Sequence, residues 1–309
     1  MTTTTRKTGA RASHPLLLAN AMPMGFHLRN LTPPPAVFDG TNGCDSFQMF
    51  LNDTLGDCVK ACDANYLLGV TFGATGSPVI VTDAEVKTDY FTETGGSDSG
   101  LDLGTDLAWE AANGLKDPTG KRHPCGPYGT VNPRDLDGFA KALYYFKWLK
   151  LGVSSASLMN ASAGQLIDAP RRSGSIDHCV GLAGRRADGA FKLVTWGEVL
   201  WVTPAWISKC CGEAWARYRD QDLINPATNQ TFDGFNLDGL QEAWAEFTGQ
   251  PPIPNPPPPV PSQLVLGPVS LVAGPLSVSL KTGPFRQTSA GTLTIPQAGP
   301  YNITFTGVQ

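Results

Sequence analysis

The sequence predicts an α+β domain that is followed by a proline-rich linker and a small all-β module. Segments with helical spacing come first along the main part of the chain, and segments with strand character follow them. This separation favours an α+β fold over an alternating parallel sheet, in which helices and strands would take turns. Prolines are then concentrated in residues 251–261, and the character of the sequence changes completely after this run.

Three stretches have the spacing of apolar residues that a helix requires. In the first, apolar residues recur at core spacing, and Asp53 or Thr54 is the expected N-cap. The second ends at a glycine, which commonly follows the last turn of a helix. An Asn-Pro-Arg-Asp segment opens the third. The predicted helices lie in residues 58–68, 105–114 and 136–146.

From Trp148 onward the chain takes on strand character. Short apolar segments rich in Val, Leu and aromatic residues are separated by Gly, Asp and Arg clusters, as strands and their turns require. The predicted strands are residues 149–153, 178–183, 191–196 and 198–203. The sheet therefore belongs to the second half of the main domain.

The two ends of the chain differ from this main domain, which we expect over residues 36–248. Residues 1–35 are expected to form a flexible N-terminal arm. Residues 249–262 hold the proline run, which favours polyproline II and makes a semi-rigid linker. Residues 263–309 contain short alternating segments between Gly-Pro and Ala-Gly turns, which predicts a small all-β module.

The module has no Cys, His, Asp or Glu, so we expect no catalysis from it. A sheet of fewer than about fifty residues is only marginally stable alone. We therefore expect residues 263–309 to pack on another copy of the chain or on a protein partner.

Composition narrows the remaining partners and the compartment. The 309 residues include 23 Lys and Arg against 27 Asp and Glu, and a formal net charge of -4 argues against nucleic acid as a partner. No run approaches the roughly 18–20 apolar residues of a membrane span. The N-terminus also lacks a convincing signal peptide. These features favour a cytoplasmic or virion-associated protein.

The seven cysteines favour a reduced compartment with at least one free thiol, because a disulfide framework normally has an even number. Cys58 and Cys62 have the spacing of a zinc knuckle, but no second pair of ligands matches it. The sequence therefore predicts no metal site and no cofactor.

Cys58 is the strongest candidate for a nucleophile. It lies at the first turn of a predicted helix, where the helix dipole and free backbone N–H groups lower the pKa of a thiol. Such a cysteine needs a base, and His178 at the head of an apolar strand is the best candidate. The alternatives are a small buried apolar side chain for Cys58 and a ring satisfied by a backbone carbonyl for His178.

These residues lie in motifs that resemble the papain-like cysteine peptidase superfamily. Asn52 stands where that family keeps a Gln whose amide lines the oxyanion hole, and Gly56-Asp57-Cys58 resembles its Gly-Ser-Cys. Asp177-His178-Cys179-Val180 resembles its Asp-His-Ala-Val strand, and Thr195-Trp196-Gly197 resembles its Ser-Trp-Gly. The resemblance covers about residues 40–220 and implies a two-lobed fold, with Cys58 in a helical half and His178 in an antiparallel β half.

The likeness is closer still to an uncharacterised papain-like group from phages and some bacteria. Residues 52–58 match its Asn-Asp-x-x-Gly-Asp-Cys motif, and residues 98–100 match its Asp-x-Gly segment. His178 then heads the strand that precedes Val-Thr-Trp-Gly at residues 194–197.

One position departs from the papain pattern. The family places an Asn two residues before the Trp to hold the histidine, and this chain has Val194 there, which can neither donate nor accept a hydrogen bond. Thr195 is expected to face the other side of the strand from Val194 and Trp196. Trp196 is expected to be a core aromatic that can shield the Cys–His pair from water.

The role of Asn52 has two interpretations that the sequence leaves open. Its amide can line the oxyanion hole, or it can form the turn and N-cap before the helix. Asp57 and Asp177 flank the two candidate catalytic residues and are expected to support them.

The sequence is therefore consistent with two functions. The first is a thiol hydrolase that acts on an amide or ester bond of a peptide or protein, with Cys58 attacking, His178 acting as ion-pair partner and general acid, and Asn52 holding the oxyanion. The second is an inactive papain-like scaffold that serves as a structural or binding protein, associated with a virion or a surface, through its β tail. Val194 and the tethered tail favour the second.

Overall fold

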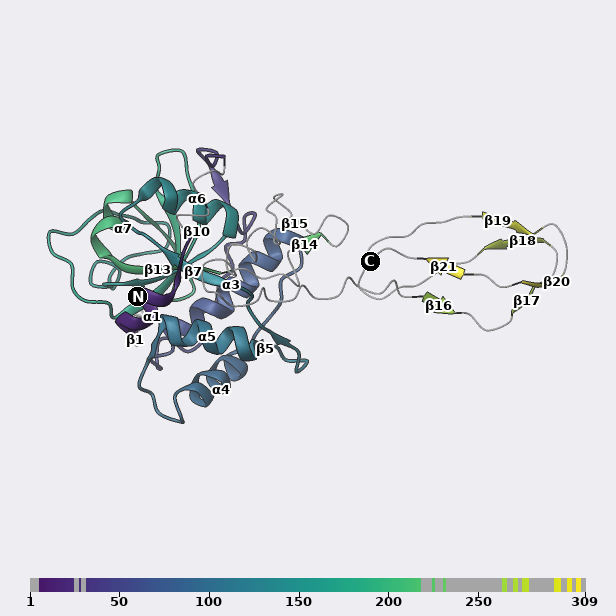
Figure 1. Ribbon diagram of the computed structural model, residues 1–309, viewed down its shortest axis with the longest axis horizontal. Coiled ribbons are helices and arrows are strands. Elements are labelled where there is room, and N and C mark those ends of the chain that lie inside the picture. The colour runs from purple at the N-terminus through teal and green to yellow at the C-terminus, as the bar shows by residue number, and fades with distance from the viewer. Residues whose placement is uncertain are drawn as a thin grey trace. The chain divides into compact units, whose positions relative to one another are not determined.

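The computed structural model describes residues 6–24, 28 and 32–217, and beyond them the backbone of short strands between residues 224 and 306 (Figure 1). The chain divides into two compact units, Met1–Asn255 and Pro256–Gln309. The expected linker, residues 249–262, lies outside the described residues. The described part of the first unit combines helices with a mostly antiparallel sheet, which confirms the predicted α+β class.

The helix α3 (Cys58–Thr75) is the centre of the helical half, and it is buried along nearly its whole length. The other described helices are α1 (Pro15–Asn20), α4 (Asp83–Glu93), α5 (Leu103–Asn113), α6 (Leu136–Phe146) and α7 (Pro204–Cys210). None of these helices is long and apolar enough to span a membrane.

Local signals explain most helix ends. α6 has the predicted bounds because the Asp135 side chain accepts a hydrogen bond from the Gly138 N–H and caps its first turn. α5 ends at Gly114, also as predicted. α4 was not predicted, although Thr82 and Glu85 form a capping box at its start.

The predicted N-cap of α3 at Asp53 or Thr54 is wrong. Asp57 is the N-cap, so the helix begins at Cys58 itself. The residues before it form a tight turn, in which the Leu55 N–H donates to the Leu51 carbonyl at 2.9 Å. This turn keeps the chain out of helical conformation until Cys58 and places the thiol at the helix N-terminus.

The described sheet has the strand order β2-β7-β13-β8-β10-β11-β12-β9, and β3 pairs with the end of β10. Neighbours are antiparallel except in the pairs β2–β7 and β12–β9. The strands β8, β10, β11 and β12 correspond to the four predicted ones. The bounds are β2 (Met22–Pro23), β3 (Phe38–Asp39), β7 (Tyr128–Val131), β8 (Leu149–Val153), β9 (Leu166–Ile167), β10 (His178–Arg185), β11 (Phe191–Thr195), β12 (Glu198–Val202) and β13 (Cys211–Arg217).

Helices α3 and α6 cover opposite faces of this sheet. Cys179 and Ala183 of β10 pack in one apolar core with residues of α3, whereas Val180 and Leu182 pack in another core with residues of α6. Alternate residues of a strand point to opposite faces, so β10 joins the two cores. Figure 1 shows α3, α4 and α5 gathered on the side away from α6 and α7.

Short strand pairs complete the described chain. Near the N-terminus β1 (Ala10–Arg11) pairs in parallel with β4 (Leu101–Asp102), and β5 (Leu115–Lys116) pairs with β6 (Arg122–His123). The antiparallel pair β14–β15 follows in the first unit. The second unit has the antiparallel pairs β16–β21, β17–β20 and β18–β19, so it is all-β in its described residues. Their bounds are Ile224–Asn225, Gln230–Thr231, Gln263–Val265, Val269–Leu271, Gly274–Ser277, Thr292–Ile295, Gly299–Tyr301 and Thr304–Thr306 for β14 to β21 in order.

Candidate active site

The fold brings Cys58 and the start of β10 together. Cys58 is the first residue of α3, His178 is the first residue of β10, and both are 1% exposed. The backbone N–H of Cys179, directly after His178, points at the Cys58 sulfur. Burial nevertheless dominates and raises the pKa of Cys58 to about 12, against the lowering effect of the Cys179 and Gly9 N–H groups. The thiol is therefore protonated in this arrangement.

The His178 ring is held from two sides. Its Nε2 lies 2.7 Å from the Thr195 hydroxyl oxygen, and its plane stacks on the Trp196 indole at 4.0 Å and 11°. Its Nδ1 has no hydrogen-bond partner among the described residues. Burial and the nearby charge of Arg6 lower the pKa of His178 to about 3, so the imidazole is neutral.

Thr195 faces the opposite side of β11 from Val194, as expected, but the expectation that it also lies opposite Trp196 is wrong. β11 ends at Thr195, and a two-residue turn follows in which Trp196 (φ +47°) and Gly197 (φ +73°) are both left-handed. Alternation places Thr195 on the face opposite Val194, and the turn brings Trp196 to the face of Thr195, so both side chains reach His178. Val194 instead packs in the apolar core that contains Cys58.

The side chains of Asn52 and Asp57 are neighbours, and Asp57 directly precedes Cys58. The Asn52 amide donates to the Leu55 carbonyl at 3.1 Å, which makes Asn52 part of the turn but not the N-cap. Neither carboxyl oxygen of Asp57 has a hydrogen-bond partner among the described residues. Burial raises the pKa of Asp57 to about 8, although the neighbouring Asn52 amide lowers it. The oxyanion role of Asn52 stays a prediction.

The Asp177 carboxylate turns away from His178 toward the loop after β8. It accepts hydrogen bonds from the backbone N–H and the hydroxyl of Ser155, at 2.9 and 3.1 Å. Its backbone carbonyl accepts from the N–H groups of Gly9 and Ala10. Asp177 therefore fixes the backbone beside His178 rather than the imidazole itself.

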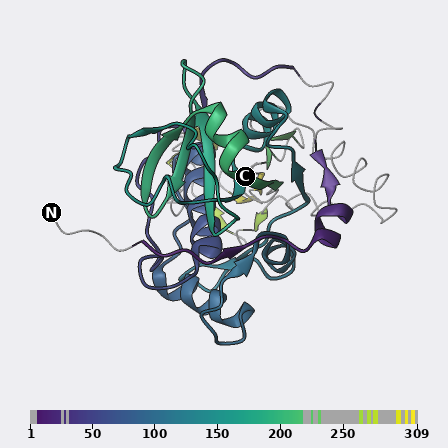
Figure 2. The same cartoon turned by 90° about the vertical axis from the view of Figure 1, so that its left-hand side faces the viewer.

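The N-terminal segment, residues 6–11, covers the site. The Lys7 N–H donates to the Asn52 carbonyl at 3.0 Å, and the Trp196 indole N–H donates to the Lys7 carbonyl at 3.0 Å. The Gly9 N–H donates to the Asp177 carbonyl at 3.1 Å. Figure 2 shows this purple segment crossing between the sheet half and the helical half. Residues 6–11 of the stretch that we expected to form an arm are thus bonded to the turn before Cys58, to the residue before His178 and to Trp196.

Charged side chains hold the same segment. Arg6 pairs with Glu198 at 2.6 Å, and its guanidinium lies over the Trp196 ring. Lys7 pairs with Asp98 at 2.6 Å. Asp98 also accepts the Gly56 N–H at 2.8 Å, so the Asp-x-Gly segment at residues 98–100 links the covering segment to the turn before Cys58.

Only glycine fits where the segment passes the thiol. A Cβ on Gly9 would lie 2.0 Å from the Gly56 carbonyl oxygen, and a Cβ on Gly100 would lie 1.8 Å from the Gly9 oxygen. Both distances are far below van der Waals contact. The backbones of Gly9, Gly56 and Gly100 therefore pack closely against one another next to Cys58.

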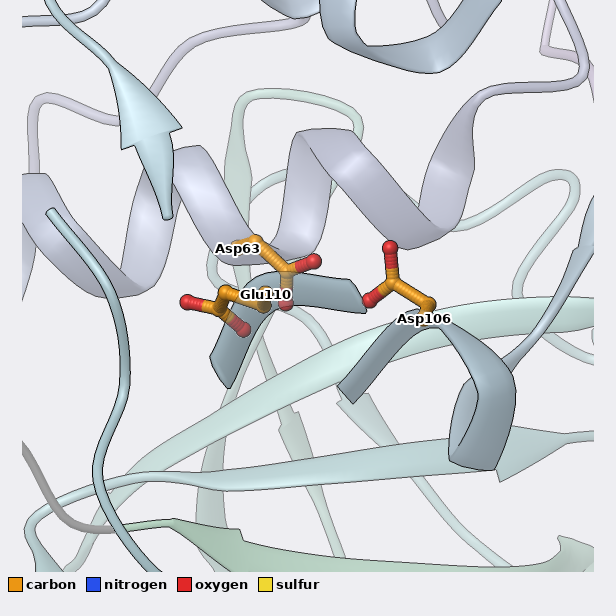
Figure 3. A group of neighbouring side chains, drawn as sticks. All are labelled: Asp63, Asp106 and Glu110. Atoms are coloured by element: carbon orange, nitrogen blue, oxygen red, sulfur yellow. The ribbon is translucent and has the colours of Figure 1, made fainter. Parts of the chain in front are cut away.

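A separate acidic group lies between α3 and α5. The carboxylate oxygens of Asp63, Asp106 and Glu110 lie within 4.8 Å of one another (Figure 3). Such a group can hold a cation, but here Lys150 pairs with Asp63 at 2.7 Å and with Asp106, and Arg217 pairs with Asp63 at 2.6 Å and with Glu110. Lys60 also pairs with Asp106, at 2.5 Å, so three cations of the protein balance the three carboxylates, and the group does not fit a resident metal ion.

Sequence reasoning missed two parts of the site. The Trp-Gly pair between two strand segments is a hairpin signal, and it could have ended the strand at Thr195. The covering role of Arg6, Lys7 and Gly9 has no such signal, because it depends on contacts with residues more than ninety positions away, such as Asp98 and Glu198.

Comparisons with solved structures place this fold. Xylellain, a cysteine protease from Xylella fastidiosa, is 14% identical with a TM-score of 0.51, over 70% of this chain and 97% of its own. Digestive procathepsin L 3 of Tenebrio molitor larval midgut is 11% identical with a TM-score of 0.53, over 70% of this chain and 77% of its own. Digestive procathepsin L2 proteinase from the same source is 12% identical with a TM-score of 0.53, over 69% and 78%. No known family and no curated protein matches the sequence. Identities at this level establish the fold, and the chain has a papain-like α+β fold.

Proposed function

We propose that this chain is a papain-like cysteine hydrolase that cleaves an amide or ester bond, with peptides or proteins as its substrates. The observation that carries the proposal is the meeting of Cys58, at the N-terminus of α3, with the backbone beside His178, whose Nδ1 has no hydrogen-bond partner among the described residues. The motifs at residues 52–58, 98–100 and 194–197 support kinship with the phage and bacterial papain-like group.

Cys58 gives its proton to Nδ1 of His178 and attacks the carbonyl carbon of the substrate, forming a carbon–sulfur bond. The carbonyl oxygen takes the negative charge and is stabilised by the Cys58 backbone N–H and the Asn52 amide, which turns from Leu55 for this purpose. The leaving amine or alcohol departs with the proton from His178. Water, deprotonated by His178, then attacks the thioester carbon and releases the acid and the thiol.

The arrangement described above is the closed form of this enzyme. Residues 6–11 exclude water from Cys58 and His178, and both groups are neutral there. A substrate must reach Cys58 and His178, so residues 6–11 have to move away before catalysis. Its departure removes Arg6 from His178 and hydrates the thiol, and both changes favour the thiolate–imidazolium pair.

The test is the rate of Cys58 alkylation, mapped by mass spectrometry, in the full chain and in Gly9→Ala. The added methyl group cannot pass the Gly56 carbonyl, so we expect the segment to leave and the rate to rise by about ten-fold or more. His178→Ala in the Gly9→Ala background should return the rate to the slow level. The Gly9→Ala chain is then screened for hydrolysis of a peptide mixture.

Thr8→Ala is the matched control, because it changes the neighbouring residue and no hydrogen bond of the Thr8 side chain is present in the described part of the chain. It should leave the alkylation rate unchanged. A Gly9→Ala thiol that reacts at the same rate with and without His178 would show that the two residues are not a catalytic pair.

The second candidate is an inactive papain-like scaffold that binds a partner. The packing of Val194 in the core and the engagement of the Asn52 amide by Leu55 favour it. In this case residues 263–309 would carry the interaction, tethered by the linker at 249–262 to the domain at 36–248, with residues 1–35 as its arm. If Cys58 is exposed but unreactive in the Gly9→Ala chain, the result would favour the scaffold over the hydrolase.

A further inference from the structure

We infer that Thr195 is the positioning residue that orients His178, in the role for which the papain pattern uses the Asn that is absent here. The inference rests on the proposed Cys58–His178 chemistry. Its geometric basis is the 2.7 Å contact between His178 Nε2 and the Thr195 hydroxyl, together with the stacking of the same ring on Trp196.

The two contacts restrict different motions of the ring. The indole of Trp196 lies nearly parallel to the imidazole at 4.0 Å and fixes its plane. Stacking alone permits a half-turn about the Cβ–Cγ bond, which leaves the ring plane unchanged but swaps Nδ1 with Cδ2 and Nε2 with Cε1. In the flipped ring a carbon would face the Thr195 hydroxyl and the hydrogen bond would be lost, so this bond keeps Nε2 on one edge and Nδ1 on the opposite edge.

The backbone supports the Thr195 side chain independently of His178. Thr195 is the last residue of β11 and pairs with Glu198 across the hairpin. The left-handed residues Trp196 and Gly197 complete the turn. A side chain at this position is therefore placed by the turn and keeps its direction when its hydroxyl is removed.

The hydroxyl also sets the tautomer that catalysis needs. When the Thr195 oxygen accepts a hydrogen bond from the Nε2–H group, the neutral ring has its free lone pair on Nδ1, where a base is required. When Nδ1 takes the proton from Cys58, the same oxygen continues to accept from Nε2 of the imidazolium. Val194 can do neither, because it has no polar group and lies in the apolar core.

The direct test is the tautomer of His178, measured by ¹⁵N NMR in the full-length chain with labelled histidine. Cys58→Ala is the background, so the result does not depend on turnover, and His178→Ala identifies the signal among the 4 histidines. We expect a single tautomer with the proton on Nε2. Thr195→Val, which keeps the shape, should give a mixture, and Thr195→Ser, which keeps the hydroxyl, should restore the single tautomer.

A second readout is the pH profile of Cys58 alkylation in the Gly9→Ala chain. Loss of an orienting group should slow the reaction by about a hundred-fold in Thr195→Val near neutral pH, with Thr195→Ser close to the parent chain. A purely structural role would lower stability but leave the profile of the folded protein unchanged. Urea denaturation checks that each variant is folded.

The outcomes separate this inference from the proposed function. If Thr195→Val leaves both tautomer and profile unchanged while His178→Ala abolishes reactivity, Thr195 is not the positioning residue and the hydrolase proposal stands. If Thr195→Val alters the tautomer but the Cys58 alkylation rate is the same with and without His178→Ala, Thr195 orients the ring and the hydrolase proposal fails.

Discussion

At the scale of the single residue, Asp57 shows how burial next to Cys58 changes an ordinary group. Neither of its carboxyl oxygens has a hydrogen-bond partner among the described residues. Burial raises its pKa from 3.8 to about 8. The folded chain therefore keeps the proton through neutral pH, whereas the unfolded chain loses it near pH 3.8. Because the native form binds more protons in this window, the contribution of Asp57 to stability decreases as pH rises.

This predicts that Asp57→Asn stabilises the fold relative to wild type, by an amount that grows with pH. The amide cannot ionise, so its free energy of unfolding, relative to wild type, should increase between about pH 5 and about pH 8, by up to ~1.4 kcal/mol per pH unit. Urea denaturation across this range measures the difference. Asp53→Asn, a half-buried neighbour in the same turn, is the control and should show a much weaker slope. A constant difference between Asp57→Asn and wild type would contradict a neutral carboxyl at residue 57.

At the scale of the elements, buried ion pairs connect the helical half to the sheet. Lys150 of β8 pairs with Asp63 of α3 and Asp106 of α5, and Arg217 of β13 pairs with Asp63 and Glu110. All these side chains are at most 1% exposed. Lys60 of α3 also pairs with Asp106, at 2.5 Å. Burial raises the pKa of Asp63, which reduces the negative charge that these three cations must balance. The network therefore joins four elements through a nearly compensated set of charges.

Removing one charged side chain from this network should lower the free energy of unfolding. We expect Lys150→Met to lower the free energy of unfolding by ~3–5 kcal/mol, because it leaves Asp63 and Asp106 buried with fewer cations. The double variant Lys150→Met, Asp63→Asn should lose less than the sum of the single changes. Urea denaturation measures all of them, and Lys121→Met on the exposed surface is the control. Strict additivity would show that Lys150 and Asp63 do not interact.

The elements also show which parts of the fold the sequence could predict. The bounds of α6 were predictable because its cap, Asp135, and its apolar spacing are local. Motif order led us to expect Cys58 beside the strand that His178 begins, and the backbone N–H of Cys179 lies at the Cys58 sulfur; the catalytic pairing of Cys58 with His178 stays a prediction. Alternation correctly placed Thr195 opposite Val194, but the side of Trp196 was not predictable from it, because a turn follows Thr195. Ion pairs such as Lys150 with Asp63 join residues 87 positions apart and leave no local pattern.

At the scale of the whole molecule, the chain consists of two units that differ in composition. Every residue of the candidate site lies in Met1–Asn255, and the second unit, Pro256–Gln309, has no Cys, His, Asp or Glu. The described strands of the second unit pair only within that unit. The first unit should therefore not need the second one for its fold or its chemistry.

A chain that ends at Asn255 tests this division. We expect it to keep the thermal midpoint of the first unit and the Cys58 alkylation rates of the full chain, with and without Gly9→Ala, because the covering segment and its partners all lie before residue 218. Sedimentation velocity then compares the two lengths. If residues 263–309 associate with other copies, the full chain sediments as an oligomer and the shortened chain as a monomer. A shortened chain that unfolds, or whose Cys58 becomes reactive without Gly9→Ala, would show that the second unit stabilises the closed form.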